Sequence, residues 1–362
     1  MAPSCRSAIG MLESTALIRH SWHPGGMEPL RLGVLGAARI SPPAIIDPAH
    51  ATGTPLVAVA ARDPQRARQF ATEHGIAQVL ADYEAVVTSP DVDTIYNPLP
   101  NGLHGPWNLA AIAAGKHVLS EKPFASNVDE AIQVRDAAAA AGVCVGEAFH
   151  YWYHPLMQRV LDLVGSGALG EIESVDADMQ IPPPSDSDPR WSFALAGGAL
   201  MDVGCYSLHA HRALGLLLGG EPTVVAARAG ERAQDPGVDE WLDVDLVFPS
   251  GATGSARCSM VREGVHMPLR VSGTKGSLYA HNFALPQLDD QLEVTIGGQT
   301  TVHRMGTRTT YTYQLEAFTA WVREGRPFAT DADDAVRQAG LIDDSYRAAG
   351  LPLRPRSQRS DA

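Results

Sequence analysis

A short turn near the start of the chain carries small residues of the kind that accommodate the phosphates of a dinucleotide. An apolar run is followed by Gly36-Ala37-Ala38-Arg39-Ile40-Ser41, where a dinucleotide fingerprint would read G-x-G-x-x-G. Alanine and serine replace the second and third glycines, but both are small enough for the backbone to approach a pyrophosphate. By itself, this turn is as typical of a plain strand-to-helix connection as of a cofactor site.

A second candidate lies at the end of the next apolar run, Pro55–Ala61. NAD-specific sites usually place an acidic side chain here, where it binds the ribose 2′-hydroxyl. This chain has Arg62 instead, with Arg66 one helical turn later, and a guanidinium can bind a 2′-phosphate through two parallel hydrogen bonds. We therefore expect NADP, with NAD as the alternative. In the other interpretation Arg62 is an exposed loop residue, and Asp63 caps the helix that begins at Pro64.

The composition excludes several classes of partner. A formal net charge of −13 disfavours binding to a nucleic-acid backbone, and 6% aromatic residues disfavour platforms for single strands. No uninterrupted apolar run is long enough for a membrane span. The four cysteines form no C-x-x-C pair, which indicates buried, reduced thiols in a cytoplasmic protein. They are Cys5, Cys144, Cys205 and Cys258.

Two histidines, His150 and His154, have the spacing of a metal-binding pair on a helix. No acidic residue accompanies them in an H-E-x-x-H pattern, so we expect no metal site.

The first half of the chain alternates short apolar runs with alanine-rich helical segments. This pattern predicts βαβ units on a parallel sheet, with right-handed crossovers that place helices on both faces. Residues 30–148 are therefore expected to form a Rossmann-type dinucleotide-binding domain. The expected strands are Leu30–Leu35, Pro55–Ala61, Gln78–Leu80, Thr94–Asn97, His117–Ser120 and Val143–Glu147. The expected helices are Pro64–His74, Asp82–Thr88, Leu103–Ala114 and Asn127–Ala141.

The second half contains β-rich segments with glycine turns between several of them. Residues 149–352 are therefore expected to form an α+β domain with an open, mainly antiparallel sheet and helices on one face. Its last helices are expected at Tyr311–Glu324 and Asp331–Ala349. Residues 1–29 are expected to be a disordered extension in which Met27 is a possible true start, and residues 353–362 a loose polar tail.

Two motifs in the first half occur together in a known family. The chain reads Asn97-Pro98-Leu99-Pro100-Asn101-Gly102-Leu103-His104 and then, at 113–123, AAGKHVLSEKP. This order resembles the glucose–fructose oxidoreductase, inositol dehydrogenase and rhizopine-catabolism (Gfo/Idh/MocA) family, over roughly residues 30–351. The resemblance implies hydride transfer between a nicotinamide cofactor and a hydroxyl or carbonyl of a sugar, polyol or diol. It also implies a homodimer or homotetramer formed through the open sheet.

The resemblance further implies that Lys122, in E-K-P, is the catalytic lysine and that the peptide bond before Pro123 is cis. A lysine ammonium can hold a substrate hydroxyl or acidify a neighbouring one. The nicotinamide is expected near the Asn97–Asn101 turn. The residues expected to bind the cofactor are Gly36, Ala38, Arg39, Ile40, Arg62, Arg66, Asn97, Pro98, Leu99, Asn101, His104, Glu121 and Lys122.

A third stretch resembles the family's active-site helix and reads GGALMDVGCYSLH at 197–209. On a helix Asp202 and Tyr206, four residues apart, would share one face. Tyrosine here resembles the branch that includes glucose–fructose oxidoreductase, dihydrodiol dehydrogenase and NADP-dependent xylose dehydrogenase. A phenol is a poor base at neutral pH, so we expect Lys122 to lower the pKa of Tyr206. Asp202 either binds substrate hydroxyls or orients Tyr206, which in the other interpretation is a buried packing aromatic.

Four further residues are expected to contact substrate: Trp152, Arg190, Trp191 and His209. Trp152 stands where many family members carry arginine, which puts an anionic contact there in doubt, and its indole could stack on a sugar. Arg190 and Trp191 follow a proline-rich loop that is otherwise an irregular surface connection. His209, one turn beyond Tyr206, is otherwise a core histidine.

Three other functions compete with hydride transfer. One is a redox-silent NADP(H) sensor, and the second is a glycosidase that uses tightly bound NAD. The third is a metal-dependent hydrolase that uses His150 and His154. The set Lys122, Asp202 and Tyr206 favours the dehydrogenase, because a sensor has no use for all three.

Overall fold

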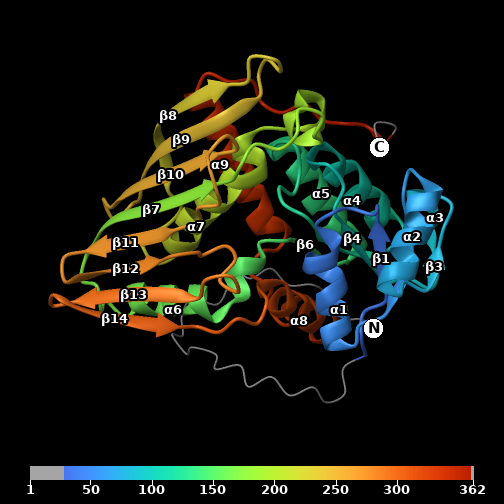
Figure 1. The fold of residues 1–362 in the computed structure, drawn as a ribbon, viewed down its shortest axis with the longest axis horizontal. Coiled ribbons are helices and arrows are strands. Elements are labelled where there is room, and N and C mark those ends of the chain that lie inside the picture. The colour runs from blue at the N-terminus through green and yellow to red at the C-terminus, as the bar shows by residue number, and fades with distance from the viewer. Residues whose placement is uncertain (1–27, 360–362) are drawn as a thin grey trace.

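The computed structural model describes residues 28–359 as two β-sheets with helices around and between them (Figure 1). The first sheet is parallel throughout, with the strand order β3-β2-β1-β4-β5-β6. Its strands are β1 (Leu32–Leu35), β2 (Leu56–Ala60), β3 (Gln78–Val79), β4 (Thr94–Asn97), β5 (His117–Ser120) and β6 (Val145–Glu147). This confirms the predicted Rossmann-type sheet.

The helices of this domain begin at short polar residues and several end at glycine. Asp63, Asp82 and Asn127 each accept a hydrogen bond from a backbone N–H of the first helical turn. Gly75 and Gly142 end two helices in the left-handed conformation. The helices are α1 (Asp47–Thr52), α2 (Pro64–His74), α3 (Tyr83–Thr88), α4 (His104–Ala113) and α5 (Val128–Ala141).

The strand order reverses between β1 and β4, and this reversal places the site. In an open parallel sheet a crevice forms at the carboxyl ends of the strands at such a switch point. The turns after β1, β4 and β5 therefore come together there, although the ends of β1 and β5, Leu35 and Ser120, are 85 positions apart along the chain. These turns carry the glycine turn, the Asn97–His104 motif and E-K-P.

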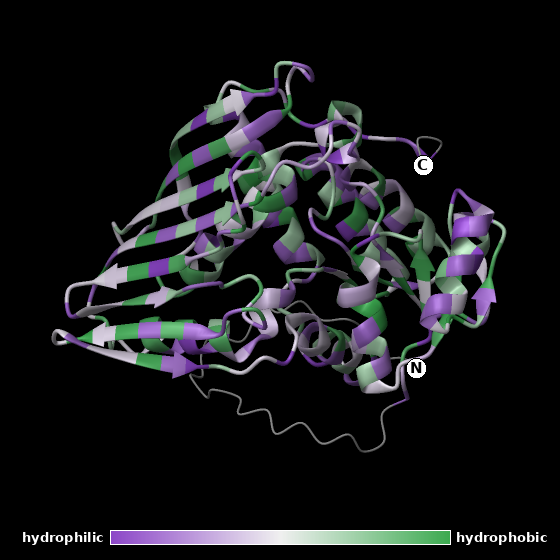
Figure 2. Cartoon of the chain, viewed as in Figure 1, coloured by the Kyte–Doolittle hydropathy of each residue, from purple (hydrophilic) through white to green (hydrophobic). Residues whose placement is uncertain are grey.

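The second sheet has eight strands in the order β14-β13-β12-β11-β7-β10-β9-β8, and all neighbours are antiparallel except β7 and β10. Its strands are β7 (Ile172–Gln180), β8 (Thr223–Glu231), β9 (Asp239–Val247), β10 (Thr253–Ser259), β11 (Leu269–Gly273), β12 (Gly276–Ala280), β13 (Gln291–Ile296) and β14 (Gln299–Arg304). The strands alternate apolar and polar residues, as Figure 2 shows. In β7, Val175 and Ala177 are buried while Asp176 between them is exposed. The predicted open, mainly antiparallel sheet is confirmed.

Helices α6 (Pro155–Gly165) and α7 (Cys205–Gly215) pack in the core of the second domain, whereas Leu315 and Phe318 of α8 (Thr310–Glu324) pack in the core of the first. The last helix is α9 (Ala332–Ala348). The α9 helix belongs to both halves of the molecule. Ala335 and Ala339 pack in the core of the first domain, whereas Ile342 and Tyr346 pack in the core of the second. The end of the expected second domain therefore also completes the Rossmann core. Within residues 28–359, no helix is both long and apolar enough to cross a membrane.

The described part of the expected loose tail is anchored, which corrects that prediction. Arg354 is fully buried, and its guanidinium donates to Asp239 Oδ1 at 2.5 Å and to the Gly197 carbonyl at 2.6 Å. Asp239 in turn accepts from the Leu200 backbone N–H at 2.7 Å. The tail thus stabilises the turn that carries Asp202. Residues 1–27, which include Met27, Cys5 and most of the expected extension, and residues 360–362 lie outside the described residues.

Replacing Arg354 with alanine should lower the free energy of unfolding by about 3–5 kcal/mol, because it leaves the buried Asp239 carboxylate without its cation. Urea unfolding followed by circular dichroism measures this change. Arg356→Ala is the matched control, since Arg356 is exposed and should change stability by less than about 0.5 kcal/mol. Equal effects of the two variants would contradict the role assigned to Arg354.

Candidate active site

A cavity of about 790 Å³ lies at the switch point of the first sheet, and the second domain closes its other side. Its walls on the Rossmann side come from the turns after β1, β2, β4 and β5. The second domain contributes Arg190, Asp202 and Tyr206. The three sequence motifs therefore face one space.

The glycine turn has the geometry that a close backbone approach needs. Gly36 has a φ of +84°, and a Cβ at this position would lie 3.3 Å from Leu99 Cδ2, so a larger residue would be strained. Arg66 Nη2 donates to the Ala37 carbonyl at 2.6 Å, which holds α2 against the turn. Arg62 lines the cavity, and Asp63 caps α2. Arg62 can therefore face a cofactor while its neighbour Asp63 caps the helix, so the two interpretations of this segment are compatible.

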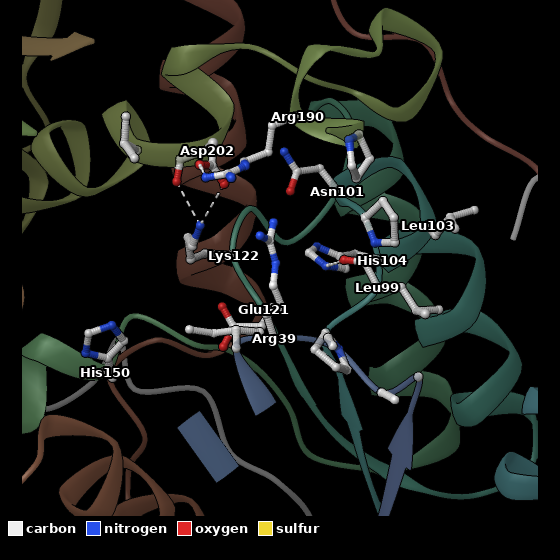
Figure 3. A pocket seen from close by; sticks show the side chains of 18 of the residues that line it. Arg39, Leu99, Asn101, Leu103, His104, Glu121, Lys122, His150, Arg190 and Asp202 are labelled. Carbon is white, nitrogen blue, oxygen red and sulfur yellow. Dashed lines mark hydrogen bonds and ion pairs between the residues drawn. The ribbon is translucent and has the colours of Figure 1, made fainter. Parts of the chain in front are cut away.

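Lys122 is held by the turn that carries Asp202. The peptide bond between Lys122 and Pro123 is cis, as expected. Lys122 Nζ donates to the Asp202 carbonyl at 2.7 Å and lies 3.5 Å from Asp202 Oδ1 (Figure 3). Burial alone would lower the pKa of Lys122, but the carboxylates of Asp202 and Glu121 outweigh it and raise that pKa. The lysine is therefore an ammonium at neutral pH.

A series of ion pairs connects Asp202 of the second domain to the glycine turn of the first. Arg190 Nη1 lies 3.4 Å from Asp202 Oδ2, and Asp188 holds the same guanidinium at 2.9 and 3.0 Å. Asp188 also pairs with Arg39 of the glycine turn at 2.9 Å. This contact joins the second domain to the turn after β1.

Tyr206 is nearly buried, and its hydroxyl lies 2.8 Å from His150 Nε2. Lys122 Nζ lies 5.5 Å from the centre of the phenol ring. Burial raises the pKa of Tyr206 well above 10, and the neighbouring Tyr311 and Glu121 raise it further. The expectation that Lys122 lowers this pKa is therefore wrong for this structure, in which the ammonium is directed at the Asp202 carbonyl.

Asp202 and Tyr206 share the cavity, but not through one regular α-helix. Residues Leu200–Gly204 form a π-helical turn, and α7 begins only at Cys205. Such wide turns are frequent at functional sites because they re-aim side chains.

Both domains of the chain match a known oxidoreductase family. Residues 30–149 match an oxidoreductase family with an NAD-binding Rossmann fold, and residues 157–279 match the Gfo/Idh/MocA C-terminal domain. D-xylose 1-dehydrogenase (NADP(+)) 2 of Haloferax volcanii is 35% identical over 323 residues, which cover 88% of this chain and 97% of the relative. The chain belongs to the Gfo/Idh/MocA oxidoreductase family.

Other family members are similar over most of their length. The dTDP-3,4-didehydro-2,6-dideoxy-alpha-D-glucose 3-reductase of Actinomadura kijaniata is 31% identical and covers 89% of this chain and 96% of the relative. The structure of a 3-ketoreductase from that organism, in complex with NADP and TDP-benzene, has a TM-score of 0.82 at 30% identity, with 89% and 98% of the chains covered. An aldose-aldose oxidoreductase from Caulobacter crescentus, complexed with glycerol, has a TM-score of 0.80 at 28% identity and the same coverage.

Most of the site residues expected from the sequence line the cavity. They are Gly36, Ala38, Arg39, Ile40, Arg62, Arg66, Pro98, Leu99, Asn101, His104, Glu121, Lys122, Arg190, Asp202 and Tyr206. Asn97 does not: it is fully buried, and its amide donates to Asn108 Oδ1 at 2.8 Å. Asn97 therefore stabilises the turn after β4 from the side that faces away from the cavity, by also donating to the His104 carbonyl at 3.2 Å.

Three expected substrate contacts lie elsewhere. His209 is the core histidine of the alternative interpretation, with its ring nitrogens 2.6 Å from the Tyr151 hydroxyl and 3.1 Å from Asp334 Oδ2. Trp191 is buried beneath Arg232. Trp152 packs against the core of the second domain and does not line the cavity. In this structure, these three side chains do not line the cavity.

Several residues that line the cavity were not predicted from the sequence, and Tyr311 and His150 are two of them. Tyr311 comes from α8, for which no local motif signalled a role in the site. His150 was considered only as half of a metal pair, but it bonds to Tyr206, whereas His154 caps α6 by accepting from the Leu156 N–H. Among residues 28–359, no cluster of three or more His, Cys, Asp or Glu side chains has the arrangement of a metal site.

Proposed function

We propose that the protein is an NADP-dependent dehydrogenase acting on a hydroxyl or carbonyl carbon of a sugar, polyol or diol. The observation that carries this proposal is the convergence of Lys122 and Tyr206, from different domains, on the cavity that contains the glycine turn. The names of the similar proteins, a xylose dehydrogenase, a sugar 3-reductase and an aldose-aldose oxidoreductase, support this class of substrate.

The residues around the cavity fit a dinucleotide. Gly36 and the two alanines after it leave the backbone of the turn bare, and Arg62 and Arg66 supply positive charge at the end of β2. These groups would hold the pyrophosphate and the 2′-phosphate. When bound, the nicotinamide supplies the hydride acceptor or donor.

The protein's own residues then handle the oxygen of the substrate. The Lys122 ammonium has two contacts to Asp202 and retains donor capacity toward the cavity, so it can stabilise negative charge on a substrate oxygen. Tyr206 takes the proton of a hydroxyl during oxidation and returns it during reduction. Arg190 holds the Asp202 carboxylate in place.

A spectrophotometric screen tests this function. The purified protein is incubated with aldoses, polyols and diols, using NADP and NAD separately, and formation of the reduced cofactor is followed at its near-ultraviolet absorbance. We expect turnover with NADP. Binding of NADPH without turnover would instead indicate the sensor, and a tightly retained cofactor with no net change in absorbance during glycoside cleavage would indicate the glycosidase.

Replacing Arg62 with alanine should weaken the use of NADP selectively. Loss of a charged hydrogen bond to the 2′-phosphate, worth about 1.5–3 kcal/mol, should raise the KM for NADP roughly 10- to 100-fold and leave that for NAD nearly unchanged. Arg68→Ala is the control, because Arg68 lies exposed on α2 and does not line the cavity. Equal increases in the KM for NADP and for NAD would show that Arg62 does not bind the 2′-phosphate.

The resemblance also supports a homodimer or homotetramer formed through the eight-stranded sheet, which we propose as the assembly. Size-exclusion chromatography with light scattering measures it.

A further inference from the structure

We propose that His150 is a positioning residue for Tyr206. In its Nε2–H tautomer the imidazole donates to the phenol oxygen, and this turns the phenol's own proton toward the cavity. The inference rests on the proposed function in one respect, since it takes Tyr206 as the group that exchanges a proton with substrate.

The geometry places His150 between two hydroxyls that come from distant parts of the chain. His150 starts the 3₁₀ turn that crosses from the first domain to the second, and its side chain is buried at the cavity wall. Its Nε2 lies 2.8 Å from the Tyr206 hydroxyl, and its Nδ1 lies 2.8 Å from Thr310 Oγ1. The ring of Tyr311 packs against the imidazole with 3.9 Å between centroids. The imidazole is thus fixed on three sides.

The ring is neutral, so one nitrogen must donate and the other must accept. Burial, reinforced by the Lys122 ammonium, lowers the pKa of His150 to about 3. A neutral imidazole carries a single N–H. Two arrangements are therefore possible. Either His150 accepts from Thr310 and donates to Tyr206, or it accepts from Tyr206 and donates to Thr310.

The buried hydroxyl of Thr310 decides between these directions. Thr310 is fully buried, and its hydroxyl has no other hydrogen-bond partner among residues 28–359. If Nδ1–H donated to Thr310, the threonine O–H would be left buried without an acceptor, which is costly. If Thr310 donates to Nδ1, the two donors inside the protein are used, because Thr310 O–H bonds to Nδ1 and Nε2–H bonds to the Tyr206 oxygen. The Tyr206 O–H is then left for the cavity, where a substrate can accept it. This assignment leaves no buried hydroxyl of Thr310 without an acceptor.

The same hydrogen bond opposes the effect of burial on Tyr206. A donor aimed at the phenol oxygen stabilises the phenolate and so favours release of the proton. The titratable and charged groups around Tyr206 are Lys122, Glu121, Asp202, Cys205, Tyr151 and Tyr311. Among the described residues, His150 is the group whose hydrogen bond reaches the Tyr206 oxygen. Removing this bond should therefore make Tyr206 a weaker base.

The tautomer can be measured without any substrate. Protein labelled with ¹⁵N-histidine is examined by long-range proton–nitrogen correlation spectroscopy, and the His150 signals are assigned by their loss in His150→Gln. We expect a protonated Nε2 and an unprotonated Nδ1 between about pH 6 and 9. A protonated Nδ1 in this range would overturn the proposal, whether or not a substrate has been found.

The effect on Tyr206 is measured with the substrate that the screen identifies. In His150→Leu, the limb of the pH profile for oxidation that requires deprotonated Tyr206 should move up by about one pH unit, and kcat on that limb should fall roughly tenfold. The KM for NADP should stay within about twofold. His150→Gln, whose amide can donate to the same oxygen, should restore the limb to within about threefold of the wild-type rate.

These variants separate positioning from mere packing. If His150 only filled space, leucine and glutamine would change the melting temperature but leave the limb in place. An unmoved limb in a folded His150→Leu variant that binds NADPH normally would therefore reject the role of His150. Absence of turnover in the wild-type protein would reject the proposed function instead and leave the tautomer measurement standing.

Discussion

Replacing Lys122 with methionine is expected to lower kcat by about 10²–10³-fold while the Kd for NADPH stays within about twofold of the wild-type value. Lys122 lines the cavity from the Rossmann side, and in the proposed mechanism its ammonium faces the substrate oxygen. Its removal takes away stabilisation of negative charge that is greatest in the transition state. Steady-state turnover and NADPH fluorescence titration measure the two quantities.

The substitution should leave the fold intact, for two reasons. Methionine matches the length of the lysine stem, and the Asp202 carboxylate keeps its pairing with Arg190. Glu121 keeps the hydrogen bond that it accepts from the Tyr96 hydroxyl. Lys275→Met is the control, because Lys275 is exposed in the β11–β12 hairpin. Near-normal turnover in Lys122→Met would contradict the mechanism, and equal losses in both variants would point to a general effect of the substitution.

The elements of the first domain could be predicted closely because local signals mark them. The bounds of β4, β5 and α2 agree with those expected from the sequence. Short apolar runs define the strands, and the α2 helix lies between its Asp63 cap and Gly75. The right-handed βαβ rule then brings the ends of β1, β4 and β5 to one edge. Most of the cofactor side of the site follows from that.

The substrate side was harder to predict because it depends on contacts between distant segments. His209 was expected near Tyr206 from their helical spacing, but every residue of α7 is buried. The first turn of this helix faces the cavity, whereas one turn later Tyr151 and Asp334 cover His209. A shared helix face therefore did not mean a shared pocket.

The burial of Arg354 in the C-terminal segment also depends on a contact with a distant part of the chain. A short polar stretch with several arginines is typical of a solvated end, yet Arg354 is buried because Asp239, 115 positions earlier, supplies its counter-charge. No local pattern reveals such a pair. His150 likewise gained its assignment only when Thr310 and Tyr206 were seen on its two sides.

Replacing Tyr206 with phenylalanine should lower kcat by about 10²–10⁴-fold, because it removes only the hydroxyl that is proposed to exchange the proton. The direction of the pH dependence follows from the raised pKa of Tyr206. At neutral pH the phenol holds its proton, so carbonyl reduction should proceed there and decline only at alkaline pH. Oxidation, which needs the proton to leave, should rise with pH. Initial rates in both directions from about pH 6 to 10 measure this behaviour.

The pH profile of the variant tells which group carries the proton. Tyr153→Phe is the matched control, since the Tyr153 hydroxyl bonds to Thr330 and does not line the cavity. It should retain both the rate and the pH dependence of the wild-type protein. If Tyr206→Phe still shows the same rise of oxidation with pH, the titrating group must be another one, and Lys122 is then the ionisable side chain best placed to replace it. If the rise disappears together with the rate, the phenol is the proton carrier, and the ammonium acts on the charge of the substrate oxygen alone.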